Sequence, residues 1–204
     1  MSTAMNTELT VAAWPGLSPR LLRGGDASES LDVYRGSGGY QPLTDPGSLL
    51  DEIGKAAVVG RGGAAFPMAV KLTTVRRASL QGLDTVLVAN GEEGEPASVK
   101  DRWLLRHRPH LVLDGLRLAA LLIGARHAHV YVSDHAAAES IRVALGEVGA
   151  DGLGGVTVSV CRVDAGYVVG EETAAVRAIN GGPAKPTDKP PRPFEEGVGG
   201  LPTV

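Results

Sequence analysis

The feature that most constrains the fold of this chain is a regular alternation of short β-branched runs with longer helix-like segments. Three apolar runs bounded by turn formers are typical of buried strands: DTVLVAN (84–90), AHVYVSD (128–134) and GVTVSV (155–160). Three segments with proline, glycine or capping residues at their ends are typical of helices: PHLVLDGLRLAALLIG (109–124), HAAAESIRVALGEVG (135–149) and GEETAAVRAIN (170–180). Strands joined by such helices predict an α/β fold with a parallel sheet and helices on both faces.

The two ends of the chain differ from this central region in composition. Residues 1–45 carry repeated glycines and prolines among polar residues, which predicts an extended N-terminal arm without a core of its own. Residues 46–180 form the predicted α/β domain. In residues 181–204, 11 of 24 positions are glycine or proline. We therefore expect an irregular tail whose order depends on a ligand or a neighbouring segment.

The overall composition is that of a globular protein, with 43% hydrophobic and 21% charged residues. A net charge of -3 provides no general attraction to nucleic acid or anionic lipid. The longest apolar stretch contains Asp114 and Arg117 and is shorter than the ~20 residues that a membrane span needs. The first ten residues have neither a basic region nor an apolar region typical of a secretory signal. We expect a cytoplasmic protein without nucleic-acid partners or membrane insertion.

Cys161 is the only cysteine, so this chain alone cannot form an internal disulfide or a cysteine-held zinc or iron–sulfur site. We expect Cys161 to be a small apolar residue of a buried strand. The five histidines show no ligand spacing joined to cysteine or to paired carboxylates. We therefore predict no metal site, and any redox chemistry requires a non-metal carrier.

A glycine-rich loop, GRGGAAFP (60–67), is the first candidate for ligand binding. Its backbone amides can approach a phosphate closely, with Arg61 inside the loop and Lys71 just beyond it. Gly60 and Gly62 begin a G-x-G-x-x-A pattern similar to a dinucleotide fingerprint. The segment before it, however, is typical of a helix running into a turn and not of a strand. The loop is therefore either a phosphate site or a plain tight turn.

The loop NGEEGEP (90–96) follows the first predicted strand and places Glu92, Glu93 and Glu95 within four positions. One interpretation is a solvated acidic turn followed by the basic segment KDRWLLRHR. The other is a binding turn, because crowded carboxylates raise a pKa or hold the hydroxyl and amide groups of a ligand. Asn90 has the donors and acceptors that suit the edge of a heterocycle.

A third loop, GYVVGEETAA (166–175), follows the third predicted strand. Glu171 and Glu172 stand at the expected start of a helix, where acidic residues are favourable through the helix dipole alone. The alternative is a binding role, because ligands of parallel α/β sheets gather beyond the carboxyl ends of the strands.

The three loops together are more specific than any one of them. GRGGAAFPMAVK, VLVANGEEGEPASVKDRWLLRHRPHLVLDGLRLAALLIGA and AGYVVGEETAAVRAINGG, in this order, closely resemble the flavin-bearing NADH dehydrogenase subunit of respiratory complex I. They also resemble its relatives in NAD-linked hydrogenases and formate dehydrogenases. The resemblance runs from about residue 38 to residue 204. It implies a Rossmann-like domain that binds FMN non-covalently and accepts a hydride from NADH stacked on the flavin.

The resemblance also implies roles for particular residues. Those expected around the FMN phosphate and ribityl chain are Gly60, Arg61, Gly62 and Lys71. Those expected at the isoalloxazine and ribityl groups, or completing the cleft, are Asn90, Glu92, Glu93, Tyr167, Gly170, Glu171 and Glu172. Those expected to contact NADH are Phe66, Glu95, Glu172 and Lys189. Phe66 would stack on the adenine, and Glu95, near the nicotinamide, is the residue nearest to a catalytic role. No side chain need act as acid or base, because the flavin accepts the hydride.

This sequence departs from the family pattern at several positions. Glu92 stands where the family has aspartate, and Ala65 and Ala69 stand where it has glycine. Thr74 replaces an aromatic residue that helps hold the adenine, and Arg192 replaces a phenylalanine. The relatives continue beyond the matching region into an asparagine pair, a ubiquitin-like domain and a helical bundle with a four-iron cluster.

The leading hypothesis is an FMN-dependent NADH dehydrogenase module. Because no iron–sulfur cluster is expected in this chain, electrons would leave the flavin for a separate iron–sulfur or ferredoxin-type protein, a quinone-linked complex, a soluble acceptor or oxygen. The alternative is a truncated or degenerate nucleotide-binding subunit with an assembly or regulatory role and no turnover. A third hypothesis is a non-flavin α/β protein that binds a phosphorylated metabolite.

Overall fold

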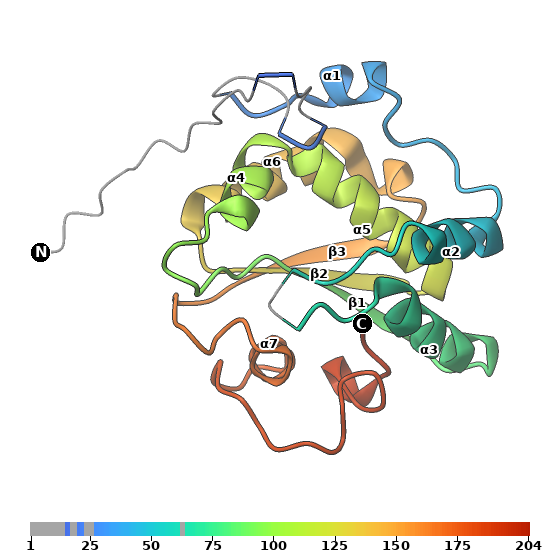
Figure 1. Cartoon of the computed structure of the whole chain (residues 1–204), viewed down its shortest axis with the longest axis vertical. Helices are drawn as coiled ribbons and strands as arrows, with labels where there is room; N and C mark the ends of the chain where they lie inside the picture. The colour runs from blue at the N-terminus through green and yellow to red at the C-terminus, as the bar shows by residue number, and fades with distance from the viewer. Residues whose placement is uncertain (1–14, 17–19, 23–26, 62–63) are drawn as a thin grey trace, which may run out of the picture.

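The computed structural model describes residues 15–16, 20–22, 27–61 and 64–204. A parallel sheet in the order β1-β2-β3 forms its centre (Figure 1). The strands are β1 (Val86–Asn90), β2 (His127–Val132) and β3 (Thr157–Arg162). All three predicted strands are present, and the parallel pairing brings their carboxyl ends to one edge of the sheet. The prediction that all three are buried is wrong for β3, which lies at an edge of the sheet and contains no fully buried residue, so that Cys161 is only half-buried.

Helices surround this sheet in the described part of the chain. They are α1 (Leu31–Gly36), α2 (Pro46–Lys55), α3 (Met68–Leu80), α4 (Lys100–His107), α5 (Pro109–Ile123), α6 (His135–Gly152), α7 (Glu172–Ile179) and the 3-10 helix η1 (Val198–Gly200). The sequence signals at α5 are confirmed, since Pro109 begins it and Gly124 ends it with a left-handed φ of 75°. None of these described helices combines the length and the apolar character needed to span a membrane.

The main hydrophobic core lies between the sheet and the helices α5 and α6. Alternate side chains of β2 point into it, and Ala128, Val130 and Val132 are at most 1% exposed. The intervening residues His129 and Tyr131 therefore point to the opposite face. Figure 1 shows α5 and α6 above the sheet and α7 below it, which confirms the prediction of helices on both faces.

The described part of the predicted N-terminal arm includes a helix that the sequence did not indicate. Ser30 caps α1, and the hydroxyl of Tyr34 donates a hydrogen bond of 3.0 Å to Asp114 on α5. Arg117, one turn further along α5, also binds Asp114, at 2.7 Å. The two charges that interrupt the apolar stretch of α5 thus hold residues of the arm against that helix. The rest of the arm, residues 1–14, 17–19 and 23–26, lies outside the described residues.

The tail is irregular, as predicted, and its last residues join the sheet. The N–H groups of Val86 and Val88 donate to the carbonyl oxygens of Pro202 and Val204 at 3.0 and 2.7 Å. Thr203 forms a parallel bridge with Val86. The chain from Pro202 to Val204 therefore covers the outer edge of β1.

Candidate functional site

The loops that follow β1 and β3 meet at the carboxyl end of the sheet. The side-chain amide of Asn90 donates a hydrogen bond of 2.8 Å to the carbonyl oxygen of Gly170. A Cβ added at Gly170 would lie 2.6 Å from Oε2 of Glu92, and a Cβ added at Gly94 would lie 2.7 Å from the carbonyl oxygen of Gly166. The loops pack so closely at these points that only glycine fits without rearrangement.

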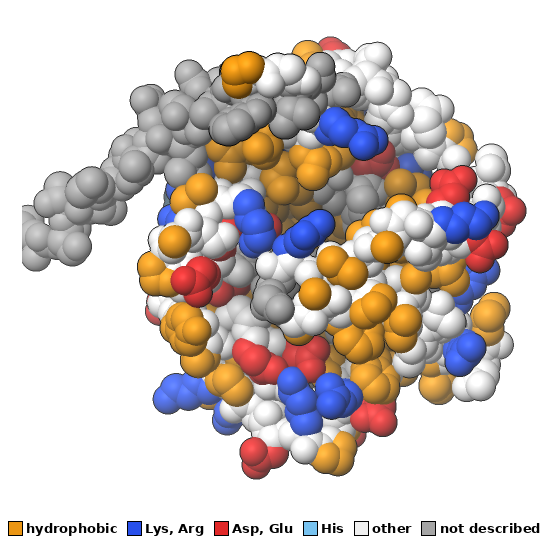
Figure 2. Space-filling model, in the orientation of Figure 1, with side chains coloured by type: hydrophobic (Ala, Val, Ile, Leu, Met, Phe, Trp, Pro, Cys, Tyr) orange, Lys and Arg blue, Asp and Glu red, His pale blue; other side chains and the backbone are white. Residues whose placement is uncertain are grey.

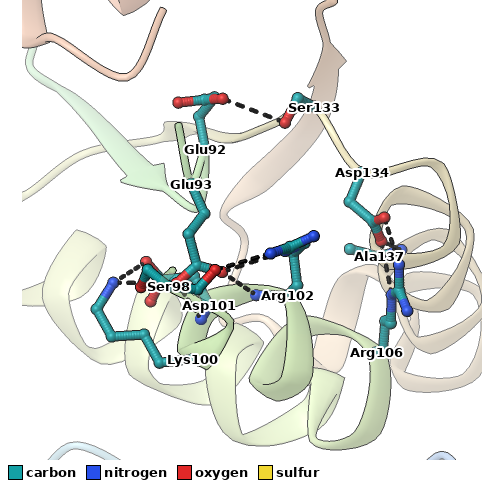
Figure 3. Close-up of polar contacts among 10 residues, drawn as sticks. All are labelled: Glu92, Glu93, Ser98, Lys100, Asp101, Arg102, Arg106, Ser133, Asp134 and Ala137. Atoms are coloured by element: carbon teal, nitrogen blue, oxygen red, sulfur yellow. Dashed lines mark hydrogen bonds and ion pairs between the residues drawn. The ribbon is translucent and has the colours of Figure 1, made fainter. Parts of the chain in front are cut away.

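Glu92 lies between these loops as a buried carboxylate with spare binding capacity. The residue is 8% exposed, and the hydroxyl of Ser133 donates to its Oε1 at 3.3 Å (Figure 3). Its Oε2 is buried without a hydrogen-bond partner in the part of the chain that the structure describes. Burial raises the pKa of Glu92 above its ordinary value, and it outweighs the opposing effect of Ser133 and of the nearby backbone N–H groups of Gly166 and Gly94. Because Gly170 packs against this oxygen, a ligand hydroxyl or N–H group would reach it only if the loop at Gly170 moved.

Glu93 points in the opposite direction and binds the start of α4 (Figure 3). Its side chain is 2% exposed and accepts hydrogen bonds from the hydroxyl of Ser98 and from the backbone N–H groups of Asp101 and Arg102, at 2.5, 3.2 and 3.1 Å. Lys100 pairs with it at 3.4 Å. Burial alone would raise the pKa of Glu93, but these hydrogen bonds and Lys100 outweigh it and lower the pKa. Glu93 thus stabilises the N-terminus of α4, and its expected contact with a ligand stays a prediction.

The acidic turn is therefore not uniformly solvated, and much of the basic segment after it is paired within the fold. Arg106 binds Asp134 at 2.8 and 2.5 Å, and Arg108 binds Glu29 at 2.9 Å.

Glu95, in contrast to Glu92 and Glu93, is exposed in this loop. The side chain of Glu95 is thus placed where a ligand can reach it.

In the third loop, Glu171 is the N-cap of α7. Its carboxylate accepts from the N–H groups of Thr173 and Ala174 at 2.8 and 3.2 Å, as the helix-start interpretation predicts. Lys189, from the tail, binds both Glu171 and Glu172 at 2.7 Å. Burial alone would raise the pKa of Glu171, but Lys189 and the hydrogen bonds from Thr173 and Ala174 outweigh it and lower the pKa. Figure 2 shows acidic and basic side chains side by side over α7.

Two further predicted positions in this part of the site differ in exposure. Tyr167 is 78% exposed, whereas Gly170 is packed against Glu92. The exposed ring of Tyr167 is available for contact with a ligand.

The glycine-rich loop lies between α2 and α3, so the predicted helix before it is confirmed. The N–H of Gly60 donates to the carbonyl oxygen of Phe66 at 3.0 Å, which closes the loop. Ala65 has a φ of 48°, in the left-handed region that favours glycine. Arg61 is exposed, and the ammonium of Lys71 lies 5.7 Å from the ring centroid of Phe66, itself 46% exposed.

Part of this loop cannot be compared with the prediction, because Gly62 lies outside the described residues. Among residues 27–61 and 64–204, no hydrogen bond or ion pair joins the loop to the loops at 90–96 and 166–172. Its place in a common site therefore stays a prediction.

Sequence reasoning missed two residues that the fold brings to this site. Tyr131 donates from its hydroxyl to the carbonyl oxygen of Val169 at 3.1 Å, and Ser133 binds Glu92. The alternation of β2 and the position of both residues near its carboxyl end could have indicated them. Within the described ranges, no three His, Cys, Asp or Glu side chains converge as metal ligands.

A parallel α/β sheet with polar and acidic loops at the carboxyl ends of its strands defines a Rossmann-like ligand-binding domain. Residues 53–204 match the family model described as the Nuo51 FMN-binding domain. The chain belongs to this family, and the resemblance drawn from its loops is confirmed.

The relatives in this family are longer proteins. An NADH-quinone oxidoreductase subunit of Rhizobium meliloti (strain 1021) is 33% identical over 205 residues, covering 91% of this chain and 48% of the relative. An NADH-quinone oxidoreductase subunit of Aquifex aeolicus (strain VF5) is 32% identical over 191 residues, covering 86% of this chain and 44% of the relative. The chain thus spans about half the length of these relatives or slightly less.

A solved structure shares both the sequence similarity and the fold. A chain of the NAD+-reducing [NiFe]-hydrogenase in the H2-reduced state is 34% identical and superimposes with a TM-score of 0.72. The match covers 78% of this chain and 28% of the hydrogenase chain.

The described residues fit the FMN group that the family binds. Oε2 of Glu92 is an orphaned acceptor, and Asn90 keeps one N–H and part of its oxygen capacity after its contacts with Gly170 and with the N–H of Glu92. Arg61 and Lys71 carry positive charge that would suit a phosphate if the glycine-rich loop belongs to the same site. These side chains would therefore provide hydrogen-bond acceptors for the hydroxyls of FMN and positive charges for its phosphate.

Proposed function

We propose that this chain is an FMN-dependent NADH dehydrogenase module of the cytoplasm that passes a hydride from NADH to FMN. The observation that carries the proposal is the meeting of the loops at Asn90, Glu92 and Gly170 in a member of an FMN-binding family. Electrons would then pass to a separate acceptor, an iron–sulfur or ferredoxin-type partner or a quinone-linked complex. The relatives named as NADH-quinone oxidoreductase subunits and as a NAD+-reducing hydrogenase support this class of reaction.

In this proposal the protein binds and orients both ligands, and bound FMN supplies the chemistry of hydride acceptance. Arg61 and Lys71, with the amides of Gly60 and Gly62, would hold the phosphate. Glu92 would accept hydrogen bonds from ribityl hydroxyls, and its burial would strengthen them.

The exposed residues around the loops would hold NADH. Phe66 is 46% exposed and would stack on the adenine, while exposed Glu95 would lie near the nicotinamide. Glu172 and Lys189 would contact the dinucleotide after their ion pair opens. Because bound FMN would supply the chemistry of hydride acceptance, these side chains would contribute mainly by orienting the two rings.

A second candidate function is a nucleotide-binding subunit without turnover. The ion pairs of Lys189 with both Glu171 and Glu172 favour it, because they engage acidic groups assigned to the ligands. The departures from the family pattern at Ala65, Thr74 and Arg192 also favour a subunit without turnover. This candidate predicts bound flavin that NADH does not reduce.

Reconstitution of the purified chain with FMN tests the two candidates. The proposal predicts flavin absorbance that bleaches anaerobically on addition of NADH, and a colourless product would contradict it. Arg61→Ala should lose flavin, whereas Glu95→Gln should keep flavin and slow its reduction. Arg142→Ala and Glu139→Gln are the matched controls, because these residues form an exposed pair on α6. Equal effects of Arg61→Ala and Glu95→Gln on both properties would refute the division of roles.

A further inference from the structure

Tyr131 occupies a position on β2 that no binding motif indicated. It is fully buried, at 0% exposure, and it lies in register with Asn90 on β1 and with Cys161 on β3. Residues in register on neighbouring strands point to the same face of a sheet. Tyr131 and Asn90 therefore stand side by side near the carboxyl ends of their strands, on the sheet face opposite the core formed with α5 and α6.

These two side chains hold consecutive carbonyl groups of the third loop. The hydroxyl of Tyr131 donates to the carbonyl oxygen of Val169 at 3.1 Å, and the amide of Asn90 donates to that of Gly170 at 2.8 Å. The next residue, Glu171, is the N-cap of α7. A two-point attachment thus fixes the loop immediately before its acidic residues.

Little room is left for the loop to adjust if this attachment changes. Gly170 already lies so close to Glu92 that an added Cβ would be 2.6 Å from Oε2.

Burial, followed by the charges of Cys161 and Glu92, raises the pKa of Tyr131 to about 12. The hydroxyl therefore stays protonated, and remains a donor, at neutral pH.

We propose that Tyr131 is a positioning residue whose hydroxyl sets the spacing between Glu92 and the acidic pair Glu171 and Glu172. The inference rests on the proposed function, which assigns these carboxylates to FMN and NADH. It adds that the fit of the flavin depends on a side chain that does not contact it.

The test is Tyr131→Phe, which keeps the ring and removes only the hydroxyl. Hydrogen exchange in the full chain without ligand should become about five- to tenfold faster at the amides of Glu171, Thr173 and Ala174, as expected for loss of one net hydrogen bond. After reconstitution, the FMN dissociation constant should rise by a similar factor, about five- to tenfold, and the visible absorption band of the bound flavin should shift.

The matched control is Tyr34→Phe, which removes a buried tyrosine hydrogen bond of 3.0 Å to Asp114. It should lower the melting temperature without changing exchange in the loop or the flavin spectrum. Unchanged loop exchange in Tyr131→Phe, or an equal change in both variants, would overturn the inference. A wild-type chain that fails to bind FMN would instead refute the proposed function, and the exchange measurement would still decide whether Tyr131 positions the loop.

Discussion

Two adjacent glutamates should respond to the same substitution in opposite directions. Glu93→Gln removes the charge that binds the hydroxyl of Ser98 and two backbone N–H groups at the start of α4. Because the Glu93 side chain is 2% exposed, water cannot replace these contacts. A lost helix cap costs about 0.5–2 kcal/mol and a charged hydrogen bond about 1.5–3 kcal/mol. Since glutamine retains one acceptor oxygen, we expect a loss of about 2 kcal/mol.

Glu92→Gln should instead leave the free energy of unfolding unchanged or raise it by up to about 1 kcal/mol. Burial disfavours the charge of Glu92, and its Oε2 has no partner among the described residues, so neutralising the side chain removes a cost. The amide of glutamine can still accept from Ser133.

The two effects also depend on pH with opposite sign. The pKa of Glu93 is lowered in the folded state, so its contribution is present above the unfolded pKa of ~4.3 and is lost as the pH falls through the folded pKa. The pKa of Glu92 is raised, so its cost is absent below ~4.3 and develops as the pH rises through the folded pKa. The deficit of Glu93→Gln should therefore shrink in acid, and so should any gain of Glu92→Gln.

Urea unfolding followed by far-UV circular dichroism at pH 7 and pH 4 measures both variants against wild type. A loss of about 2 kcal/mol corresponds to roughly 4–8 °C in melting temperature for a chain of this length. A Glu93→Gln variant within 0.5 kcal/mol of wild type, or a shift of both variants in the same direction by similar amounts, would refute the reasoning.

Three further substitutions test the helix starts and the loop. Asp134→Ala removes the N-cap of α6 and the ion pair with Arg106, so unfolding should cost about 2 kcal/mol less, while Asp134→Asn should lose only part of that. Lys189→Met should cost less than about 1 kcal/mol, because the side chain is 31% exposed, and the difference should shrink with added NaCl in the same urea assay. Ala65→Gly should stabilise the chain by up to about 1 kcal/mol, because its φ of 48° disfavours alanine; a destabilised variant would contradict this strain.

The secondary structure was largely predictable because local rules govern it. Alternating β-branched runs gave the three strands, and the proline and glycine around α5 gave its limits within a residue. Helices α1, α3 and α4 were not predicted. The six residues of α1 are held by a contact between Tyr34 and Asp114, which are 80 positions apart. A contact of that kind leaves no periodic signal in the sequence.

The candidate site was predictable in its loops but not in the use of each side chain. The three glutamates in residues 90–96 indicated a turn with a binding or structural role. The sequence alone, however, does not distinguish Glu92, which keeps an unpaired oxygen among the described residues, from Glu93, which caps α4. Lys189 was assigned through family resemblance, and its ion pairs with Glu171 and Glu172 depend on the path of the tail.

The sequence by itself determined the order of the three strands and of the helices α5, α6 and α7, and with it the parallel sheet and the edge where the loops gather. Hydrophobic periodicity and the residues that begin and end helices act over a few positions, so they can be recognised in the sequence alone. Only the tertiary structure decided which polar groups meet across that edge, as when Tyr131 and Asn90 hold the carbonyls of Val169 and Gly170. These pairings depend on strand register and loop path, which long-range packing selects.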